Sequence, residues 1–261
     1  MRKDYILVDE PSQVEIQFVE NYWTSVWERQ GNTTISADWL VKKDEYRVIA
    51  PHLASLPDDA KILDGGCGLG EWVLALTRKG FNVVGADLSS RTILKLQEQF
   101  PDLPFVECDI RRMEFVDGSF DAYFSWGVFE HFESGPQDCL SEAWRILKPG
   151  GLLFISVPLD NLRQAVIGSL SKPKSIEAHK SRFYQYRFTR SELVREINLA
   201  GFEVLSTHPI HKRQGVLRSL HHEFGFSYDW LITKALSVLL APLVPGWMIA
   251  HMVLAVARKP S

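Results

Sequence analysis

Short apolar runs alternate with helical patterns of apolar residues from about residue 60 onward. We predict strands near 61–64, 82–87, 104–107, 121–126 and 151–157, and helices near 69–79, 90–99 and 136–147. The capping-box pattern Thr189-Arg-Ser-Glu192 predicts a helix that ends at Ala200 before Gly201, and strands near 202–208 and 249–257 follow. The alternation predicts an α/β fold with a mainly parallel sheet and helices on both faces.

The N-terminal part carries a different pattern. Residues 11–30 place apolar and aromatic side chains at near-helical spacing, and a second helix is expected from about Asp38 to Leu56. We therefore expect residues 1–57 to form a helical cap outside the sheet domain, which spans 58–261. Some aromatic residues of this cap are candidates for a lid, but such spacing more often reflects plain packing, so we assign them no chemistry: Tyr22, Trp23, Trp27 and Trp39.

A long insertion at 159–188 interrupts the alternation of strands and helices. It is basic and aromatic, which predicts either substrate contacts or a solvated basic face. The side chains concerned are His179, Lys180, Arg182, Tyr184, Tyr186 and Arg187.

A second insertion, at 211–248, contains the apolar stretch 231–245, where Lys234 is the one charged residue. The stretch is too short and too interrupted by proline for a membrane span, which needs roughly 20 apolar residues. We favour packing within the protein. A dimer face, a channel wall for an apolar substrate and a peripheral, interfacial membrane element remain open.

Composition narrows the class of protein. The 261 residues suit one domain with additions, and 29 basic against 32 acidic side chains give a net charge of −3, which does not favour nucleic acid as a partner. The three cysteines, Cys67, Cys108 and Cys139, show no ligand spacing and cannot all pair. No apolar signal segment follows the N-terminus. We expect a cytoplasmic protein without a disulfide framework.

The stretch Lys61-Ile-Leu-Asp-Gly-Gly-Cys-Gly-Leu-Gly-Glu-Trp72 combines a strand, a glycine turn and a helix start. Glycine lets a ligand approach the backbone closely, and a helix N-terminus presents free N–H groups to an anion. The glycine spacing departs from the dinucleotide fingerprint, and no Gly-Lys-Ser/Thr follows, which argues against nicotinamide and nucleotide triphosphate chemistry. Because Asp64 precedes the turn, a ligand with both an amine and a carboxylate fits best.

Two further acids follow neighbouring strands of the predicted sheet. Asp87 closes the second strand, where it is placed to accept both hydroxyls of a ribose, although a helix N-cap is the simpler alternative. Asp109 follows the third strand, where it is placed to accept an exocyclic amine or acts only as a turn residue. Beside the glycine turn, ribose binding is the favoured role of Asp87.

With these motifs in register, the chain resembles the class I S-adenosylmethionine-dependent methyltransferases. The stretches Asp117-Gly-Ser-Phe-Asp-Ala-Tyr-Phe-Ser-Trp126 and Ala143-Trp-Arg-Ile-Leu-Lys-Pro-Gly-Gly151 strengthen the resemblance, which covers about residues 60–158. The family fold is a Rossmann-like seven-stranded sheet with one late antiparallel strand, which His251-Met-Val-Leu-Ala-Val-Ala-Arg-Lys259 would supply.

The resemblance implies a set of residues that bind S-adenosyl-L-methionine. Asp64 and the turn residues Gly65, Gly66, Cys67, Gly68 and Gly70 would hold the methionine part, and Asp87 the ribose. Leu88 would pack on the adenine, and Asp109 with Ile110 would fix its amine. The backbone near Ser125 and Trp126 would face the sulfonium.

The sequence Trp126-Gly-Val-Phe-Glu-His-Phe132 resembles the Glu-His pair of ubiquinone-biosynthesis methyltransferases that act on small molecules. Some of those relatives add a third acidic residue for a metal, but Gly127 stands at that position, so we expect no metal site. His131 is the candidate general base, and Glu130 either orients the site or has a structural role. We expect an O-methyltransferase with a small-molecule acceptor. Methylation of nitrogen, carbon or a macromolecule, and a non-catalytic cofactor-binding regulatory protein, remain the alternatives.

Overall fold

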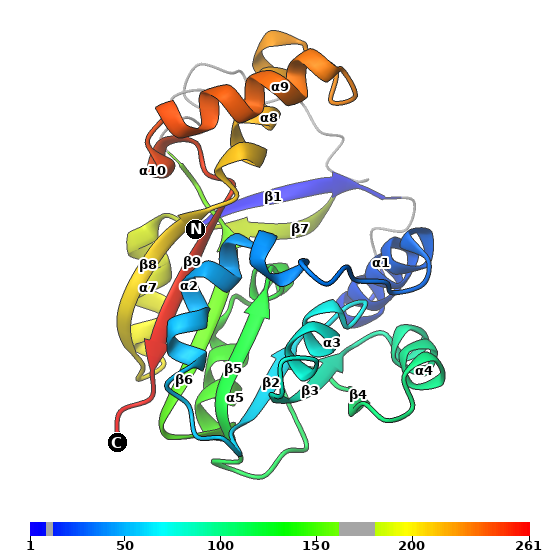
Figure 1. Cartoon of the computed structure of the whole chain (residues 1–261), viewed down its shortest axis with the longest axis vertical. Helices are drawn as coiled ribbons and strands as arrows, with labels where there is room; N and C mark the ends of the chain where they lie inside the picture. The colour runs from blue at the N-terminus through cyan, green and yellow to red at the C-terminus, as the bar shows by residue number, and fades with distance from the viewer. Residues whose placement is uncertain (9–12, 162–180) are drawn as a thin grey trace.

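The main sheet has seven strands. Their bounds are β2 (Lys61–Gly65), β3 (Asn82–Asp87), β4 (Phe105–Glu107), β5 (Phe120–Trp126), β6 (Leu147–Pro158), β8 (Glu203–Ile210) and β9 (Met252–Arg258). The computed structural model describes residues 1–8, 13–161 and 181–261 (Figure 1). The strand order is β4-β3-β2-β5-β6-β9-β8, and β9 runs antiparallel to the other six strands of this sheet. The Rossmann-like sheet predicted from the sequence is confirmed.

Helices cover both faces of this sheet. One face packs against α2 (Asp44–Leu53), α3 (Glu71–Thr77) and α4 (Ser90–Gln99), and the other against α5 (Gln137–Ile146) and α7 (Arg190–Leu199). Neighbouring residues of one strand enter opposite layers: Ile62 packs in the first layer and Leu63 in the second, and both are fully buried. Burial on both faces explains why these strands are continuous apolar runs in the sequence.

The predicted capping box is present, and the residue that caps α4 is Ser89 rather than Asp87. Thr189 and Glu192 form the expected reciprocal capping box at the start of α7, and Ser89 caps α4 by accepting a hydrogen bond from the backbone N–H of Thr92. β6 begins at Leu147, earlier than predicted, because the backbone N–H of Gly150 bonds to the carbonyl of Lys259 and keeps the turn in the sheet.

The N-terminal segment is not wholly helical, in contrast to the predicted cap. It begins with β1 (Arg2–Leu7), which pairs antiparallel with β7 (Ser181–Arg187) in a separate two-stranded sheet (Figure 1). The predicted helices follow as α1 (Glu15–Gln30), a short 3-10 helix (Leu40–Lys42) and α2. The division between residues 57 and 58 stays a prediction, and His179 and Lys180 of the basic insertion lie outside the described residues.

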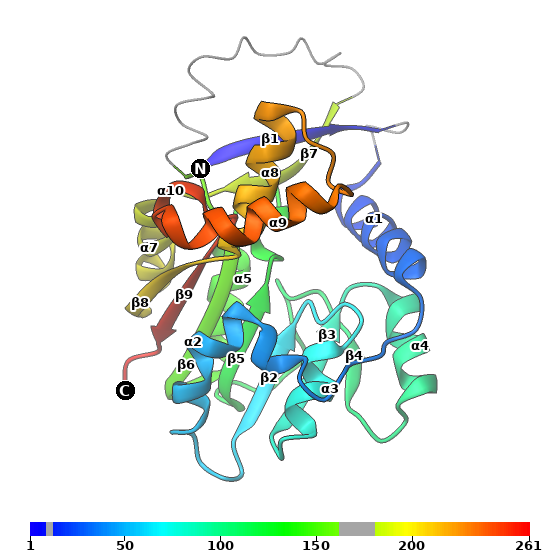
Figure 2. The ribbon, with the colours of Figure 1, turned by 45° about the horizontal axis from the view of Figure 1, so that its top comes forward.

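A helical C-terminal cap connects β8 to β9. It consists of α8 (Lys212–Phe224), α9 (Leu231–Leu240), the 3-10 helix η4 (Ala241–Leu243) and α10 (Gly246–Ile249). Figure 2 shows this cap at the same end of the molecule as β1 and β7. Our favoured interpretation, packing of 231–245 within the protein, is wrong for the outer face, where Leu231 is 83% and Leu239 is 66% exposed. Among the described residues, no helix is long and apolar enough to cross a membrane.

Candidate active site

A cavity of about 220 Å³ lies where the carboxyl ends of β2, β3, β4 and β5 meet. β2 pairs with β3 on one side and β5 on the other, so the segments that leave these strands diverge and leave a crevice. Ten of the residues predicted from the sequence line this cavity: Asp64, Gly66, Cys67, Gly68, Asp87, Leu88, Asp109, Ile110, Trp126 and His131.

Four other predicted residues lie behind the cavity wall. A Cβ on Gly65 would come within 2.3 Å of the Tyr123 ring, and the Ser125 hydroxyl donates a hydrogen bond of 2.5 Å to the Gly65 carbonyl. Gly70 takes a left-handed conformation at the start of α3. Glu130 is 1% exposed. Gly65, Gly70 and Ser125 therefore shape the turn and hold it against β5.

Asp64 lines the cavity with a buried carboxyl group. Its side chain is 1% exposed, and its Oδ2 atom has no hydrogen-bond partner within the protein. Burial, with a further contribution from the charge of Asp87, raises the pKa of Asp64 well above its usual value. A carboxylate in such a place is complementary to a cationic group, which supplies the missing partner and favours the ionised form.

Asp87 joins the glycine turn to the start of α4. Its Oδ2 accepts a hydrogen bond of 2.8 Å from the backbone N–H of Gly68, and its Oδ1 accepts one of 2.9 Å from that of Ser89. Burial raises the pKa of Asp87, and these N–H groups oppose the increase. Each carboxylate oxygen keeps a second lone pair, so both can still accept a hydroxyl.

Asp109 has a partner that the sequence analysis missed. Arg111 donates to both oxygens of Asp109, from Nε at 3.1 and 3.2 Å and from Nη2 at 2.9 Å, and it also reaches Glu15 of α1 at 2.9 Å. The carboxylate lines the cavity while it holds an arginine that ties β4 to α1. Its contact with an adenine amine stays a prediction.

Helix α1 supplies the wall that faces the glycine turn. Val19, Glu20, Trp23 and Trp27 line the cavity, and the Trp23 and Trp27 rings stack with centroids 5.2 Å apart. The sequence showed this aromatic pair, but helical spacing did not separate a lid from ordinary packing. Further lining residues that we did not predict are Leu69, Glu71, Trp72, Ser89, Cys108, Gly127, Val128 and Phe132.

His131 reaches the cavity from the short helix after β5, in a defined tautomer. Its Nδ1 lies 2.8 Å from the backbone carbonyl of Tyr184. A carbonyl only accepts, so the Nδ1 atom carries the hydrogen, and Nε2 is left with a lone pair. Burial lowers the pKa of His131 to about 4, with the bond to Tyr184 opposing the decrease. The imidazole is therefore neutral near pH 7 and presents a basic nitrogen.

Tyr184 owes its position to an irregularity in the β1–β7 ladder. Asp4 lies opposite Gln185 and Tyr5 lies opposite Phe183, so Tyr184 has no partner across the ladder. Such an extra residue changes the direction of a side chain, often next to active sites. The Tyr184 ring lies 5.1 Å from the His131 ring and 5.4 Å from that of Tyr22.

Two arginines of the insertion at 159–188 have structural partners. Arg187 is 9% exposed and pairs with Asp4 at 2.6 Å, and Arg182 donates to the carbonyl of Gln13 at 2.5 Å while it lies over the Phe18 ring. These contacts hold the small sheet and α1 together. A solvated basic face is therefore not formed by the described part of this insertion.

Metal and disulfide chemistry find no support in the described ranges. Residues 1–8, 13–161 and 181–261 contain no group of three or more His, Cys, Asp or Glu side chains that could hold a metal ion. Glu130 and His131 are two groups, with Glu130 Oε1 at 3.9 Å from His131 Nε2. The three cysteines are free, and Cys67 and Cys139 are buried.

Comparisons with known proteins agree with this geometry. Residues 63–155 match the family model described as a methyltransferase domain. The C-methyltransferase UbiE of ubiquinone/menaquinone biosynthesis from Campylobacter jejuni is 28% identical over 188 residues, which are 63% of this chain and 78% of that protein. These comparisons support a class I S-adenosylmethionine-dependent methyltransferase.

Other known proteins are similar to this chain over different lengths. The methyltransferase YqeM of Bacillus subtilis is 34% identical over 110 residues, which cover 40% of this chain and 44% of that protein, less than half of its length. The solved structure of phosphoethanolamine N-methyltransferase 2 from Haemonchus contortus superposes with a TM-score of 0.62 at 18% identity, covering 95% of this chain and 60% of that one. At that identity the structural match concerns the fold.

The cavity fits the cofactor of this methyltransferase class. Asp64 offers an unpartnered buried carboxylate to an ammonium, and Asp87 keeps lone pairs for two ribose hydroxyls. The turn leaves room for a ligand because Gly66 and Gly68 have φ of 84° and 50° and no side chain. These are the donors and acceptors that a nucleoside joined to an amino acid requires.

Gly68→Ala tests how closely α1 approaches the turn. A Cβ at Gly68 would lie 2.8 Å from Cζ2 of Trp27, so we expect the indole to be displaced and the affinity for S-adenosylhomocysteine to fall about tenfold. Gly80→Ala is the matched control, because its φ is also positive, at 92°, but no atom lies within 4 Å. Calorimetric titration of both variants measures the effect. Equal affinities would contradict a lid role for Trp27.

Glu130→Gln tests the buried carboxyl behind the cavity. Burial raises the pKa of Glu130 from 4.5 to about 8, so its contribution to stability is complete below pH 4.5 and is lost as the pH rises through 8. The depressed pKa of His131 acts in the opposite direction, but only between about 4 and 6.5. Between pH 6.5 and 8, His131 therefore does not offset the loss of stability that comes from Glu130.

We therefore expect wild type to lose up to about 2 kcal/mol of unfolding free energy, relative to Glu130→Gln, between pH 6.5 and 8. Urea unfolding at the two pH values measures this difference. Glu133→Gln, at a glutamate whose side chain is 55% exposed, should behave as wild type. Parallel curves for wild type and Glu130→Gln would contradict the buried-acid assignment.

Proposed function

We propose that the chain transfers a methyl group from S-adenosyl-L-methionine to a small-molecule acceptor, at a hydroxyl oxygen. The observation that carries the proposal is the tautomer of His131, whose unprotonated Nε2 belongs to a cavity-lining side chain. When bound, the cofactor supplies a methyl group that is already activated on a sulfonium. The residues of the chain then have to hold the acceptor, exclude water and accept its proton.

His131 is suited to the proton transfer because it is neutral near pH 7. Its Nε2 would take the proton that the acceptor hydroxyl loses as the oxygen forms its bond to carbon, and the Nδ1 bond to the Tyr184 carbonyl would stabilise the resulting imidazolium. Above about pH 8, Glu130 would assist this proton transfer, because its ionised carboxylate lies 3.9 Å from Nε2 of His131.

The walls beside His131 support an acceptor with an apolar or aromatic body. Trp23 lies edge-on to His131 at 5.0 Å, and Val128 and Phe132 also line the cavity. Aromatic faces suit a flat, uncharged acceptor and help to exclude water. With the net charge of −3, this favours a small molecule over nucleic acid.

Methylation of carbon is a second candidate because UbiE, the relative from Campylobacter jejuni, is named a C-methyltransferase. The same base would serve a phenol whose adjacent ring carbon attacks after the hydroxyl loses its proton. Nuclear magnetic resonance of the product separates the two outcomes, since a methyl on oxygen and a methyl on an aromatic carbon have different carbon shifts.

Two measurements test the proposal. Calorimetric titration with S-adenosylhomocysteine should show one binding site per chain, and a panel of small phenols and alcohols with labelled S-adenosyl-L-methionine should give a methylated product. Absence of binding would reject the cofactor assignment. Binding without a product, together with a tight protein partner, would favour the non-catalytic regulatory alternative.

A further inference from the structure

Helix α9 presents apolar side chains to the outside and small polar ones to the protein. Thr233 and Ser237 are fully buried, whereas Leu231, Val238 and Leu239 are 83%, 51% and 66% exposed. At about 3.6 residues per turn, the three exposed side chains share one face of the helix. A surface helix in water has the reverse pattern, so the outer face of α9 is matched to an apolar medium.

The orientation of α9 is fixed by its inner contacts. The Ser237 hydroxyl donates to the carbonyl of Lys234 at 2.7 Å and accepts from Nε of Arg213 on α8 at 3.2 Å. The buried Ser237 therefore has partners where it lies. Rotating α9 to bury its leucines would break the bond from Arg213 and place larger side chains against α8.

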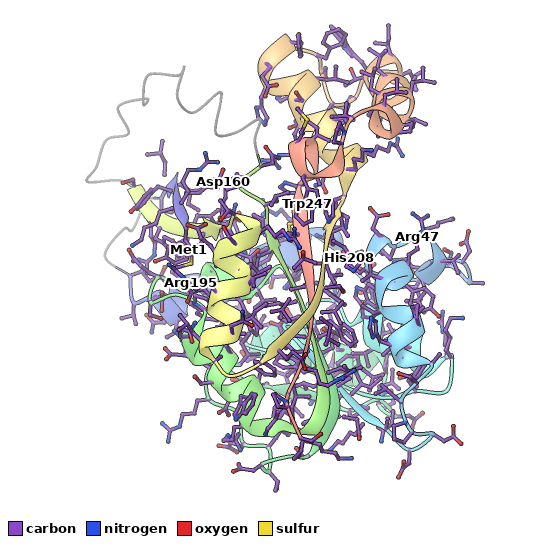
Figure 3. The ribbon with its side chains drawn as sticks, turned by 90° about the vertical axis from the view of Figure 1, so that its left-hand side faces the viewer. Met1, Arg47, Asp160, Arg195, His208 and Trp247 are labelled. Atoms are coloured by element: carbon purple, nitrogen blue, oxygen red, sulfur yellow. The ribbon has the colours of Figure 1, made fainter. Side chains whose placement is uncertain are left out.

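The exposed apolar surface is concentrated in one place. Of the seventeen large apolar side chains that are exposed in the described residues, nine lie between Phe224 and Met248. We call the outer side of this segment the apolar face, and its members are Phe224, Trp230, Leu231, Ile232, Val238, Leu239, Leu240, Leu243 and Met248. Figure 3 shows the side chains of α8 and α9 projecting outward at the end of the molecule beyond the labelled Trp247. Exposed apolar side chains gathered in one region of a structure often mark an interaction site.

Cations flank the apolar face, although the chain as a whole is acidic. Lys234 lies on α9, and Lys212 and Arg213 reach the carbonyl of Pro242 and the hydroxyl of Ser237 from α8. Residues 211–249 contain four cations and two acids, and the acids lie before α9: Lys212, Arg213, Arg218 and Lys234 against Glu223 and Asp229. The region therefore has the opposite sign to the net charge of −3.

We propose that the apolar face lies in the headgroup region of an anionic lipid bilayer. With 10 residues α9 spans about 15 Å, half of the roughly 30 Å of a hydrocarbon core, so it lies in the plane of the membrane. Apolar side chains on one face, a tryptophan at the helix start and lysine and arginine at the rim are the properties of such helices. Residues 230–249 contain no acidic side chain, and the cations of the cap are complementary in charge to anionic headgroups.

A second copy of the chain fits this face less well. A two-fold contact places a patch against itself, so Lys234 and Arg213 of both copies would approach one another. The membrane proposal does not depend on the methyl acceptor.

Flotation of the full chain with phospholipid vesicles tests the proposal. We expect binding to an equal mixture of phosphatidylglycerol and phosphatidylcholine, with weaker binding at high salt and to phosphatidylcholine alone. The double variant Leu231→Gln/Leu239→Gln should lower the partition coefficient at least about tenfold. Leu94→Gln/Val116→Gln is the matched control, because these side chains are 59% and 77% exposed elsewhere on the molecule.

A second measurement locates the contact within the protein. Brominated lipids should quench the fluorescence of Trp230, and Trp230→Phe should remove that quenching while the other tryptophans remain. Failure of wild type to float with anionic vesicles would overturn the proposal, as would equal partition of the two double variants. Concentration-dependent dimerisation that disappears in Leu231→Gln/Leu239→Gln would overturn it in favour of a self-interface.

Discussion

Replacing Asp87 by alanine should lower the affinity for S-adenosylhomocysteine at least about 100-fold, because hydrogen bonds to a charged acceptor contribute roughly 1.5–3 kcal/mol each. The carboxylate would bind the ribose hydroxyls through its remaining lone pairs. It also holds the backbone N–H groups of Gly68 and Ser89, at 2.8 and 2.9 Å. Alanine therefore removes the ligand contacts and releases the turn. Calorimetric titration of wild type and variant measures the loss.

Asp121→Ala is the matched control for this experiment. Asp121 also accepts a bond from a backbone N–H, that of Lys61 at 2.9 Å, and pairs with Lys148 at 2.8 Å, but it lies outside the cavity. This variant should lose stability and keep its affinity. If Asp87→Ala kept an affinity within a few-fold of wild type in a folded protein, the ribose assignment would be abandoned.

The second large effect is expected at His131. His131→Ala should lower kcat about 10²- to 10⁴-fold, the range over which general bases contribute, and change the affinity for S-adenosylhomocysteine less than about threefold. Steady-state kinetics with the acceptor from the screen, combined with titration, separates the two effects. Because the pKa of His131 is lowered to about 4, the base should remain available in wild type down to about pH 5.

Tyr184→Phe tests whether the Tyr184 hydroxyl, rather than His131, is needed for catalysis. His131 bonds to the backbone carbonyl of residue 184, so phenylalanine keeps both that bond and the aromatic ring. We expect kcat to remain within a few-fold of wild type. Full activity of His131→Ala, or a loss in Tyr184→Phe as large as in His131→Ala, would contradict the role of His131 as the base.

The sequence predicted most of the sheet and brought together most of the residues that line the cavity, because both depend on local signals. Buried parallel strands are short apolar runs, and an acid at or just beyond the carboxyl end marks each of three strands, as at Asp64, Asp87 and Asp109. The family resemblance then suggested a ligand for each of these acids. The capping box at Thr189 is equally local and was predicted at its observed position.

The tertiary structure decided what depends on distant segments. β1 pairs with a strand about 180 residues away, and the bulge at Tyr184 and the tautomer of His131 follow from that pairing. No local pattern in the first residues distinguishes such a strand from a loop. Likewise, the contact of Arg111 with both Asp109 and Glu15 exists only because α1 packs beside β4.

The sequence by itself determined the strands of the main sheet, most of the helices that cover it, the glycine turn and the acids of the cavity, because turn geometry and side-chain periodicity act over a few residues. Only the tertiary structure decided that Trp27 covers Gly68, that burial raises the pKa of Glu130, and that α9 turns its leucines outward. Burial is a property of everything that surrounds a residue. A stretch as apolar as 231–245 therefore reads as core in the sequence, although the fold places its outer face at the surface.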